Sequence, residues 1–571
     1  MNFRQLAGRA VWTSSTLSLS LAAASLLLPG RALAADWEDE LAQGQETTEE
    51  GGDTTEQIPT EGGDVVETLQ PDAEGAIREL PPSPAPAAAT TPASRTQISG
   101  YVRQSFETNY GQMLREARAP AIPGGDVPAP TLWRDVFLSR TQLALRGSYL
   151  RGRHFEATIS GVLGYTLHVA KEAPQYSVDV ISGARSDLEV KLTRGELDAD
   201  LRDAYLGFFW PGVDLRIGQQ RVAWGRTDFQ SPNDVINARD LRDPLLGETE
   251  LRYLPTPLVR ASFSSGVVTF EGIVAPIFVP DRFDAYGSNW SALQERAPSQ
   301  LLALVGRTST VVDSSVERDL ARLWRQTELP ANDGKGVAAG ARISASLSST
   351  DLSAYYHYGY DSLPFVSASP AFLDYLRDTD LQTMGVESTL APLLKELDSG
   401  RRPLSARYLR RHHVGFDVST ILGAWTLRLD AAYQSQRVFY DASLFSVASP
   451  TLLGVAAVEY QTGSLDDVFI LEVLGARLLD APETGLLGYR RDSTAIAGTL
   501  RWTLIDSWGL DLRGVVGLAP QTYTLQPALQ YKPNDALSVR VGALVVTGER
   551  GSFGWYYGDN DTAFVQLRWA F

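Results

Sequence analysis

The chain has 571 residues, of which 44% are hydrophobic, and it carries a formal net charge of −17 and no cysteine. The lack of cysteine excludes disulfide bridges, thiolate metal sites and cysteine nucleophiles. After the N-terminal segment no window holds 18 consecutive apolar residues, which argues against membrane-spanning helices. If this chain enters a membrane, it must do so with strands.

Residues 1–34 have the features of a secretory signal peptide. Two arginines precede a short apolar stretch at about residues 17–28, and Ala32-Leu33-Ala34 forms an A-x-A cleavage site. The apolar stretch is shorter than the roughly 20 residues that a spanning helix needs. We therefore expect residues 1–34 to be removed during export.

Residues 35–94 are first acidic and then rich in proline. Between residues 36 and 80 there are 15 Asp and Glu and a single Arg, a net charge of −14, and residues 80–92 have the sequence LPPSPAPAAATTP. Such a segment has little apolar surface to bury and is typical of disorder. We expect a periplasmic segment that either is a solvated linker or binds a basic periplasmic partner.

From residue 95 to residue 571 apolar and polar residues alternate in strands of about ten residues. In residues 213–222, for example, Val213, Leu215 and Ile217 alternate with Asp214 and Arg216. We predict about 18 strands (16–18), near residues 97–110, 135–148, 154–168, 200–210, 213–223, 257–263, 267–276, 336–347, 351–360, 405–420, 424–436, 453–462, 467–478, 492–505, 508–518, 521–531, 536–547 and 561–571.

The connections between these strands alternate in length. Tight links follow the even-numbered strands, and long links, one of them residues 277–335, follow the odd-numbered ones up to the ninth. Outer-membrane barrels have short periplasmic turns and long extracellular loops. The pattern predicts an all-β fold: one closed antiparallel transmembrane β-barrel in the outer membrane of a Gram-negative bacterium, with membrane lipid against its outer face. The inward-facing half of nearly every strand is expected to be polar.

The chain ends on a strand, TAFVQLRWAF, in which Phe571, Trp569 and Leu567 share one face. A terminal strand must be paired to stay ordered, so we expect it to close the barrel onto the first strand. Its terminal aromatic residue resembles the C-terminal signal that the bacterial barrel-assembly machinery recognises. The resemblance implies that Phe571 and Trp569 form an assembly signal and that this machinery is a partner.

Some features of the loops and of the outer face are also predicted. Helical spacing predicts short helices at residues 314–327, 370–379 and 388–400. They could fold into the pore or pack on one another above the rim. Lipid-facing aromatic residues, such as Trp425, Trp502, Trp508 and Trp569, are expected to form girdles at the two membrane interfaces.

The predicted inner wall carries more bases than acids. Inward bases are Arg140, Arg146, Arg216, Arg260, Arg342, Arg428, Arg501, Arg513, Arg540 and Arg568. Inward acids are Asp203, Asp214, Glu271, Asp417, Asp430 and Asp511. Arginines in a water-filled lumen would concentrate anions, but the same residues could instead form arginine–carboxylate ladders that brace the wall. The predicted pore-lining residues are Arg216, Arg260, Arg342, Arg428, Arg513 and Arg540.

The segment GQQRVAWGRTDFQSPNDVINARDL, residues 218–241, is the most distinctive part of the chain. It predicts a turn at residues 232–234 followed by a short helix, and residues 224–243 are a candidate constriction loop. The candidates within that loop are Trp224, Gly225, Arg226, Asp228, Arg239 and Asp240.

The same segment resembles an uncharacterised family of proteobacterial porin-like outer-membrane barrels with a domain of unknown function. The family fingerprint is G-R-Q-x-x-x-W-G-E followed by N-x-I/V-N-x-x-D, and the matching residues are Gly218, Gln220, Trp224, Gly225, Asn237 and Asp240. Gln219 and Arg226 replace the usual Arg and Glu, so the charges at those two positions are not carried over. The alginate-export porins share a similar G-x-Q strand. The resemblance implies a porin-like barrel.

Catalysis has no support in the sequence. None of the five histidines lies in a nucleophile elbow or at metal-ligand spacing, and His412 and His413 alternate faces on a strand. We expect no enzyme activity, no cofactor, no metal and no nucleic-acid partner. The predicted function is a passive porin or export channel for small or polymeric anionic solutes. The alternative is a plugged structural barrel that tethers periplasmic partners through its acidic segment.

Overall fold

The computed structural model describes residues 94–110, 137–169, 187–192, 195–246, 249–283, 288–294, 296–297, 327–328, 330, 336–378, 386–441, 443–462, 467–482, 485–505 and 507–571. The predicted signal peptide, residues 35–93 and nearly all of the predicted helix 314–327 lie outside these residues.

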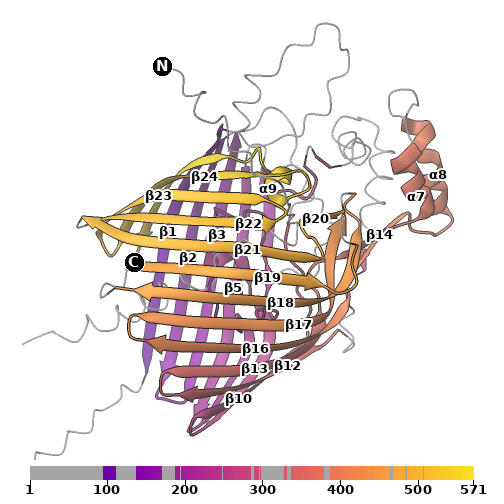
Figure 1. The fold of residues 1–571 in the computed structure, drawn as a ribbon. Helices are drawn as coiled ribbons and strands as arrows, with labels where there is room; N and C mark the ends of the chain where they lie inside the picture. The colour runs from indigo at the N-terminus through magenta and orange to yellow at the C-terminus, as the bar shows by residue number, and fades with distance from the viewer. Residues whose placement is uncertain are drawn as a thin grey trace, which may run out of the picture.

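Among the described residues, eighteen antiparallel strands close into a barrel (Figure 1). They are β1 (Arg95–Asn109), β2 (Phe137–Arg151), β3 (Phe155–Val169), β5 (Gly195–Trp210), β6 (Val213–Gln220), β9 (Thr256–Ser265), β10 (Val268–Ala275), β12 (Ala338–Leu347), β13 (Thr350–Tyr360), β16 (Arg410–Leu422), β17 (Trp425–Asp441), β18 (Ser446–Gln461), β19 (Val468–Leu478), β21 (Asp492–Ile505), β22 (Trp508–Ala519), β23 (Thr522–Asn534), β24 (Leu537–Gly548) and β25 (Thr562–Ala570). The predicted 18-stranded barrel is confirmed.

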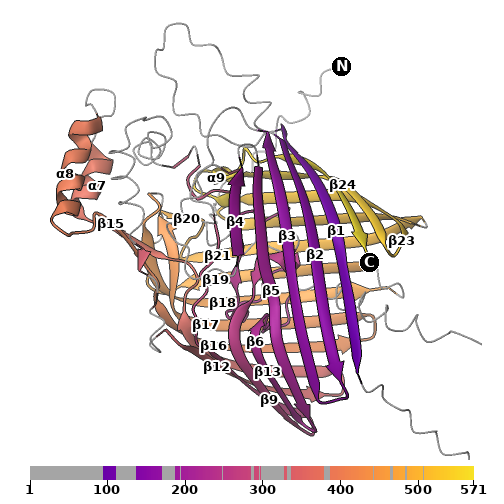
Figure 2. The same cartoon turned by 180° about the vertical axis from the view of Figure 1, so that it is seen from behind.

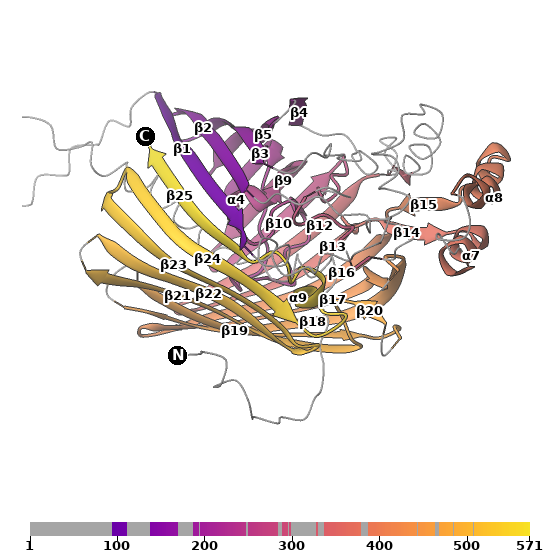
Figure 3. The same cartoon turned by 90° about the horizontal axis from the view of Figure 1, so that it is seen from above.

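The last strand closes the barrel, as the sequence predicts. β25 pairs with β24 on one side and with β1 on the other, in a register that runs from Tyr101↔Ala570 to Asn109↔Thr562 (Figure 3). Phe571 also exchanges backbone hydrogen bonds with Gly100, at 2.8 and 2.9 Å. Closure leaves no sheet edge unpaired, which is the condition for a sheet in hydrocarbon.

The outer face of the wall is apolar. In β3, which lies between β2 and β5 on the side shown in Figure 2, Ile159 and Leu163 are 61% and 45% exposed, whereas inward Thr158 is 4% exposed. The same alternation of exposed apolar and buried polar residues occurs in β13, β16 and β17. Because this exposed apolar belt surrounds a closed sheet, the chain is a transmembrane barrel of the outer-membrane type.

The four tryptophans named as girdle residues do not divide between the two interfaces. Trp425 and Trp508 begin β17 and β22, and Trp502 and Trp569 lie near the ends of β21 and β25, so all four lie toward the end of the barrel with tight turns. Exposed tyrosines lie toward both ends: Tyr165, Tyr356 and Tyr523 toward the long loops, and Tyr149 and Tyr531 toward the tight turns. Both aromatic types suit an interface, because each joins an apolar ring to a polar atom.

Two of the predicted loop helices are present. α7 (Pro370–Asp378) and α8 (Val386–Asp398) lie side by side beyond the long-loop rim, not in the pore (Figure 1). A small sheet of β11 (Thr327–Glu328), β14 (Phe365–Ala368) and β15 (Leu404–Arg407) also belongs to these loops. No helix within the described ranges is both long and apolar enough to cross a bilayer.

The remaining described elements are short pieces of the long loops. β4 (Asp187–Leu192) extends the pairing of β5, and β20 (Leu486–Leu487) pairs with β17. β7 (Ala238–Arg239) pairs with β8 (Tyr253–Leu254), α4 (Thr249–Arg252) precedes β8, and α9 (Phe553–Tyr556) lies between β24 and β25. Ser552 caps α9 by accepting a hydrogen bond from the backbone N–H of Trp555.

The inner wall is not polar all round, which corrects the sequence-based expectation. On the β18–β24 side Val455, Leu474, Val515 and Val546 face inward and are at most 8% exposed. They pack in one hydrophobic cluster with loop residues that include Phe229. Loop segments cover this side, so its wall buries apolar side chains instead of facing water.

Candidate functional site inside the barrel

Residues 221–246 and 249–255, which we call the inner segment, lie between β6 and β9 in the interior of the barrel. Trp224, Thr227 and Asn233 in this segment are at most 1% exposed. The predicted helix after the turn at residues 232–234 is wrong, because the chain stays irregular up to β7. Asn237 explains part of the difference: its side chain accepts from Val222 N at 3.2 Å and donates to Val222 O at 2.8 Å, which holds the segment as an open hairpin.

Trp224 fixes the first turn of the inner segment to the wall. Its Nε1 donates to Glu271 Oε1 at 2.7 Å, and Arg260 Nη2 donates to Glu271 Oε2 at 2.6 Å. The indole ring lies 5.2 Å from the ring of Tyr355. Gly340 on β12 makes room for it, because a Cβ atom there would lie 2.7 Å from the indole. Glu271 and Arg260 therefore brace the segment through a buried tryptophan.

Gly225 allows the next residues to reach β17. Its φ is +90°, which favours glycine. Asp430 on β17 then accepts from Arg226 N at 3.0 Å, from Thr227 N at 3.1 Å and from Thr227 Oγ1 at 2.8 Å. A carboxylate that accepts several N–H groups in a buried site forms strong, charge-assisted bonds.

Gly225→Ala is expected to displace this turn. A Cβ atom at residue 225 would lie 1.7 Å from Ser231 Oγ and 2.7 Å from Asp430 Oδ2, in addition to the strain of a positive φ. The barrel itself should still form. Trypsin digestion of the folded variant should cleave within the inner segment, whereas Gly400→Ala, in an open turn where a Cβ atom would meet nothing within 4 Å, should leave that segment protected.

Two further carboxylate contacts hold the middle of the segment. Glu472 on β19 accepts from Asp228 N at 2.7 Å and from Phe229 N at 3.1 Å. The Asp228 carboxylate pairs with Arg428, which also pairs with Glu459 on β18. Arg226 reaches the other way, with its Nη2 3.1 Å from Asp351 Oδ2. The segment is thus bound to the β10–β19 side of the wall mainly by acids.

Arg239 and Asp240 lie in the half of the segment near the long-loop end. Arg239 N donates to Asp281 Oδ1 at 2.7 Å, and Arg242 Nη2 and Arg282 Nη1 lie 2.8 and 3.1 Å from Asp240 Oδ2. Burial raises the pKa of the Asp281 carboxyl to about 6. Burial alone would also raise the pKa of Asp240, but Arg242 and Arg282 together hold it below its usual range.

The inner segment reaches the opposite wall near Leu246. Arg103 on β1 and Gln566 on β25 both donate to the carbonyl oxygen of Leu246, at 3.5 Å. Next to this contact Asp243 Oδ2 lies 2.9 Å from Arg140 Nη1 on β2. The segment therefore crosses the lumen from the β10–β19 side to the side formed by β25, β1 and β2.

The six arginines predicted to line a pore fall into two groups. Arg260 and Arg428 bind carboxylates that hold the inner segment, and Arg216 lies 3.5 Å from Asp214. Arg342 donates to Ser353 Oγ at 3.2 Å and lies over the ring of Tyr355. Arg513 and Arg540 instead lie on the opposite side of the barrel.

Arg513 and Arg540 belong to a larger basic cluster, which we call the arginine arc. It runs along the inner faces of β21, β22, β24, β25 and β1, and its members are Arg501, Arg513, Arg540, Arg568 and Arg103. Asp511 lies 2.9 Å from both Arg513 Nη2 and Arg540 Nη2, and it is the register partner of Arg501. Arg103 and Arg568 are register partners across the closing seam. Among the described residues of this stretch of wall, five guanidinium groups therefore lie near Asp511, which pairs directly with Arg513 and Arg540.

A polar cavity adjoins the arc between the inner segment and strands β1–β5. Its empty volume is about 1070 Å³, and its lining includes Arg103, Glu107, Arg140, Asp240 and Arg252. Arg103 belongs both to this cavity and to the arc. The described part of the lumen therefore has polar space next to its most basic wall.

Several inward charged residues were not predicted from the sequence. Arg103 and Glu472 are 2% and 1% exposed. Glu472 is the single acid in the apolar run VFILEVLGARL. An isolated acid in such a strand indicates a buried carboxylate with a hydrogen-bond partner inside the barrel, and this signal could have identified Glu472. Arg411 and Arg437, near the long-loop end of β16 and β17, were also missed.

The family model described as "protein of unknown function (DUF1302)" matches residues 170–571, and a search of curated proteins finds no match. The fold is similar to OccAB1 from Acinetobacter baumannii, at 8% identity over 85% of this chain and 98% of that one, with a TM-score of 0.41. It is also similar to the outer membrane protein OpdK from Pseudomonas aeruginosa (8% identity, 84% and 99% covered, TM-score 0.38) and to a BenF-like porin from Pseudomonas fluorescens (8%, 83% and 98%, 0.39).

Proposed function

The chain belongs to the DUF1302 family of proteins of unknown function, and for this member we propose a channel function. It is an outer-membrane porin or export channel through which small or polymeric anionic solutes diffuse passively. The observation that carries the proposal is the arginine arc, in which five inward arginines of the described strands gather along one stretch of wall beside Asp511.

The arc favours anions for electrostatic reasons. The low-dielectric wall of a lumen focuses the field of its charges. Each guanidinium offers a planar fork of donors that fits a carboxylate or phosphate. Arginines spaced along the wall also provide several weak sites, so an anion can move from one to the next without being held.

In the proposed channel the inner segment forms the constriction, which lies next to the arginine arc. It is held on one side by Glu271, Asp430 and Glu472 and on the other by Arg103 and Gln566, through Leu246. Because the contacts are buried and mostly charge-assisted, they define a fixed edge of the passage. In this proposal Arg260 and Arg428 brace the segment, and Arg513 and Arg540 face the solute.

Charge reversal in the arc is expected to reverse the ion selectivity. In a planar bilayer under a salt gradient, the native channel should have a reversal potential of the sign that anion selectivity gives. The double variant Arg513→Glu and Arg540→Glu changes the local charge by about four units and should shift that potential toward cation selectivity. Arg477→Glu is the control, because Arg477 is 61% exposed on β19 beside Asp492.

Two outcomes would contradict the proposal. Cation selectivity of the native protein, or an unchanged reversal potential in the double variant, would mean that the arc only braces the wall. The absence of current steps would favour the alternative, a plugged barrel that tethers periplasmic partners through residues 35–94. That alternative is supported by the apolar cluster on the β18–β24 side, which contains Val455, Val515 and Phe229.

A further inference from the structure

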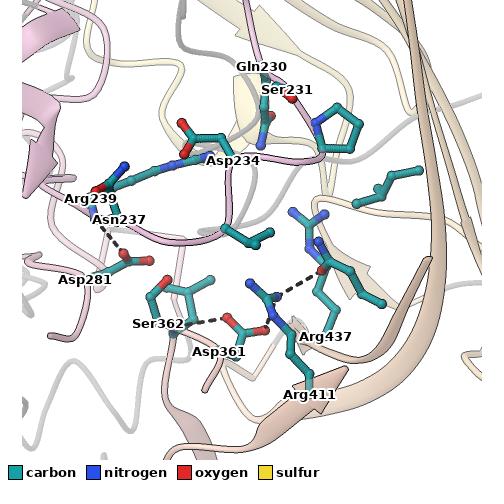
Figure 4. Close-up of a pocket in the computed structure, with 15 residues that line it drawn as sticks. Gln230, Ser231, Asp234, Asn237, Arg239, Asp281, Asp361, Ser362, Arg411 and Arg437 are labelled. Atoms are coloured by element: carbon teal, nitrogen blue, oxygen red, sulfur yellow. Dashed lines mark hydrogen bonds and ion pairs between the residues drawn. The ribbon is translucent and has the colours of Figure 1, made fainter. Parts of the chain in front are cut away.

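A two-part cavity lies where the inner segment meets the long-loop end of the wall. Figure 4 shows the residues that line its polar part. Its polar part has an empty volume of about 510 Å³ and is lined by residues that include Arg239, Asp361, Arg411 and Arg437. Its apolar part has an empty volume of about 570 Å³ and is lined by residues that include Phe229, Leu474, Tyr489, Ala495 and Val515. Gln230, Pro232 and Leu453 line both parts, so the two are contiguous.

Arg437 is a buried cation in the polar part. Its residue is 8% exposed, and its Nη2 donates to Tyr489 Oη at 3.3 Å. Its guanidinium also lies 5.6 Å from the ring centre of Phe439 and 5.8 Å from that of Tyr489. Among the residues that the structure describes, no carboxylate lies within ion-pair distance of Arg437. Burying a charge without a counter-ion is costly, so this site is suited to an anion.

Among the buried polar atoms of this lining, Arg411 Nε and Gln230 Oε1 have no hydrogen-bond partner within the described part of the chain. These residues are 8% and 6% exposed. Arg411 Nη1 is occupied, since it donates to Asp361 Oδ2 and to Gln434 Oε1, both at 2.9 Å. Its Nε therefore remains as a donor beside Arg437, and the Gln230 amide can serve either as donor or as acceptor.

The charges in the polar part are balanced only when every carboxylate is ionised. The lining holds Arg239, Arg411 and Arg437 against Asp234, Asp281 and Asp361. Burial raises the pKa of Asp281 to about 6, so proton uptake there leaves one net positive charge. The Arg411 guanidinium donates to Asp361, whereas the Arg437 guanidinium forms no ion pair with a carboxylate among the described residues, which makes Arg437 the cation available to a ligand.

Tyr489 connects the polar part to the apolar part. Its hydroxyl oxygen accepts from Arg437, while the residue lines the apolar part. A ligand whose anionic group lies at Arg437 would have its remaining atoms directed along Tyr489 toward Phe229 and Leu474. Polar groups at one end of a mostly apolar lining are typical of small-molecule sites, where they fix the orientation of the ligand.

We propose that this cavity is a binding site for a small amphipathic monocarboxylate. The carboxylate is held by Arg437 and by Arg411 Nε, and the aromatic or aliphatic body fills the space between Phe229, Leu474 and Val515. The site deepens the proposed channel function, on which it rests, by naming a class of solute that is captured at the long-loop end before it passes the arginine arc. Binding itself requires no current, so it can be tested separately.

The test is equilibrium binding to the full barrel in lipid nanodiscs, with 3-phenylpropionate as the probe. Two matched probes separate the contributions: 3-phenylpropionamide keeps the ring and loses the charge, and acetate keeps the charge and loses the ring. The native protein should bind 3-phenylpropionate at least about tenfold more tightly than it binds the amide or acetate. The loss of one charge-assisted hydrogen bond, or of one buried ring, weakens affinity by at least that factor.

Two variants test the two parts of the cavity. Arg437→Gln should weaken 3-phenylpropionate binding about tenfold or more and leave amide binding unchanged. Ala495→Leu adds volume to the apolar part and should weaken 3-phenylpropionate without changing acetate. Arg477→Gln, on the outer face, is the control and should bind as the native protein does. Heat-modifiable migration on a gel shows whether each variant is folded.

Equal binding of acid and amide, or native affinity in folded Arg437→Gln, would overturn the proposed site. If folded Arg437→Gln lost the native affinity but Ala495→Leu kept it, the carboxylate contact would stand and the assignment of the apolar body would fall. Bilayer recordings of Arg437→Gln in simple salt distinguish this from the channel proposal. The channel of this variant should remain anion-selective, because its arginine arc is intact. The binding measurement does not depend on whether the channel is anion-selective.

Discussion

Asp430→Ala is expected to release the inner segment from β17. The substitution removes the acceptor for Arg226 N, Thr227 N and Thr227 Oγ1, and Asp430 is fully buried. Each buried donor left without a partner costs about 1–3 kcal/mol. The stability of the segment in its position on the wall should therefore decrease by several times RT. Limited trypsin digestion of the folded barrel should then cleave after Arg226, and single-channel conductance should rise and become more variable.

The matched control is Asp214→Ala. Asp214 also faces inward, but its side chain is 31% exposed and its contact with Arg216 is 3.5 Å long. An exposed ion pair contributes about 0–1 kcal/mol, so digestion of this variant should follow the native rate. If Asp430→Ala were as resistant to trypsin as Asp214→Ala, the carboxylate anchors would not be what holds the segment.

Val565→Arg is expected to destabilise the barrel by about 2–4 kcal/mol, the cost of a guanidinium at the midplane of the lipid face. Val565 is 41% exposed near the middle of β25, and its register partners Val541 and Phe106 are likewise exposed apolar residues. The measurement is guanidinium-induced unfolding in lipid vesicles, followed by tryptophan fluorescence.

Ser344→Arg is the control for depth and face. Ser344 lies inward in β12, where it pairs with Thr269 and Ser353, while its neighbour Ile343 is 44% exposed to lipid. An arginine there can reach the polar interior, so the loss of stability should be small. Equal losses for Val565→Arg and Ser344→Arg would mean that the inner and outer faces differ less than their side chains indicate.

The sequence by itself determined the barrel, its strand number and, where apolar and polar residues alternate clearly, the face on which a residue lies. Strand periodicity is a local property, because successive side chains point to opposite sides whatever the strand pairs with. The strand 492–505 was therefore predicted at its observed limits, and Arg540 and Leu567 were assigned to opposite faces as the structure has them. The alternation of tight and long links was likewise enough to predict closure of residues 562–570 onto the first strand.

Only the tertiary structure decided what occupies the lumen. The inner segment has no periodicity, since its backbone groups are satisfied by side chains distant in sequence, such as Asp430 and Glu472. For the same reason the sequence favoured a helix after residue 234 where the structure has an open hairpin.

The roles of individual arginines were also decided by tertiary contacts. Arg428 and Arg513 have the same strand environment in the sequence, yet Arg428 pairs with Asp228 of the inner segment and Arg513 shares Asp511 within the arginine arc. Which arginine is neutralised depends on the path of a loop through the barrel, and that path follows from the sum of many weak, long-range contacts. Local sequence determines the face on which a charge lies, whereas its partner is determined only when the whole chain is folded.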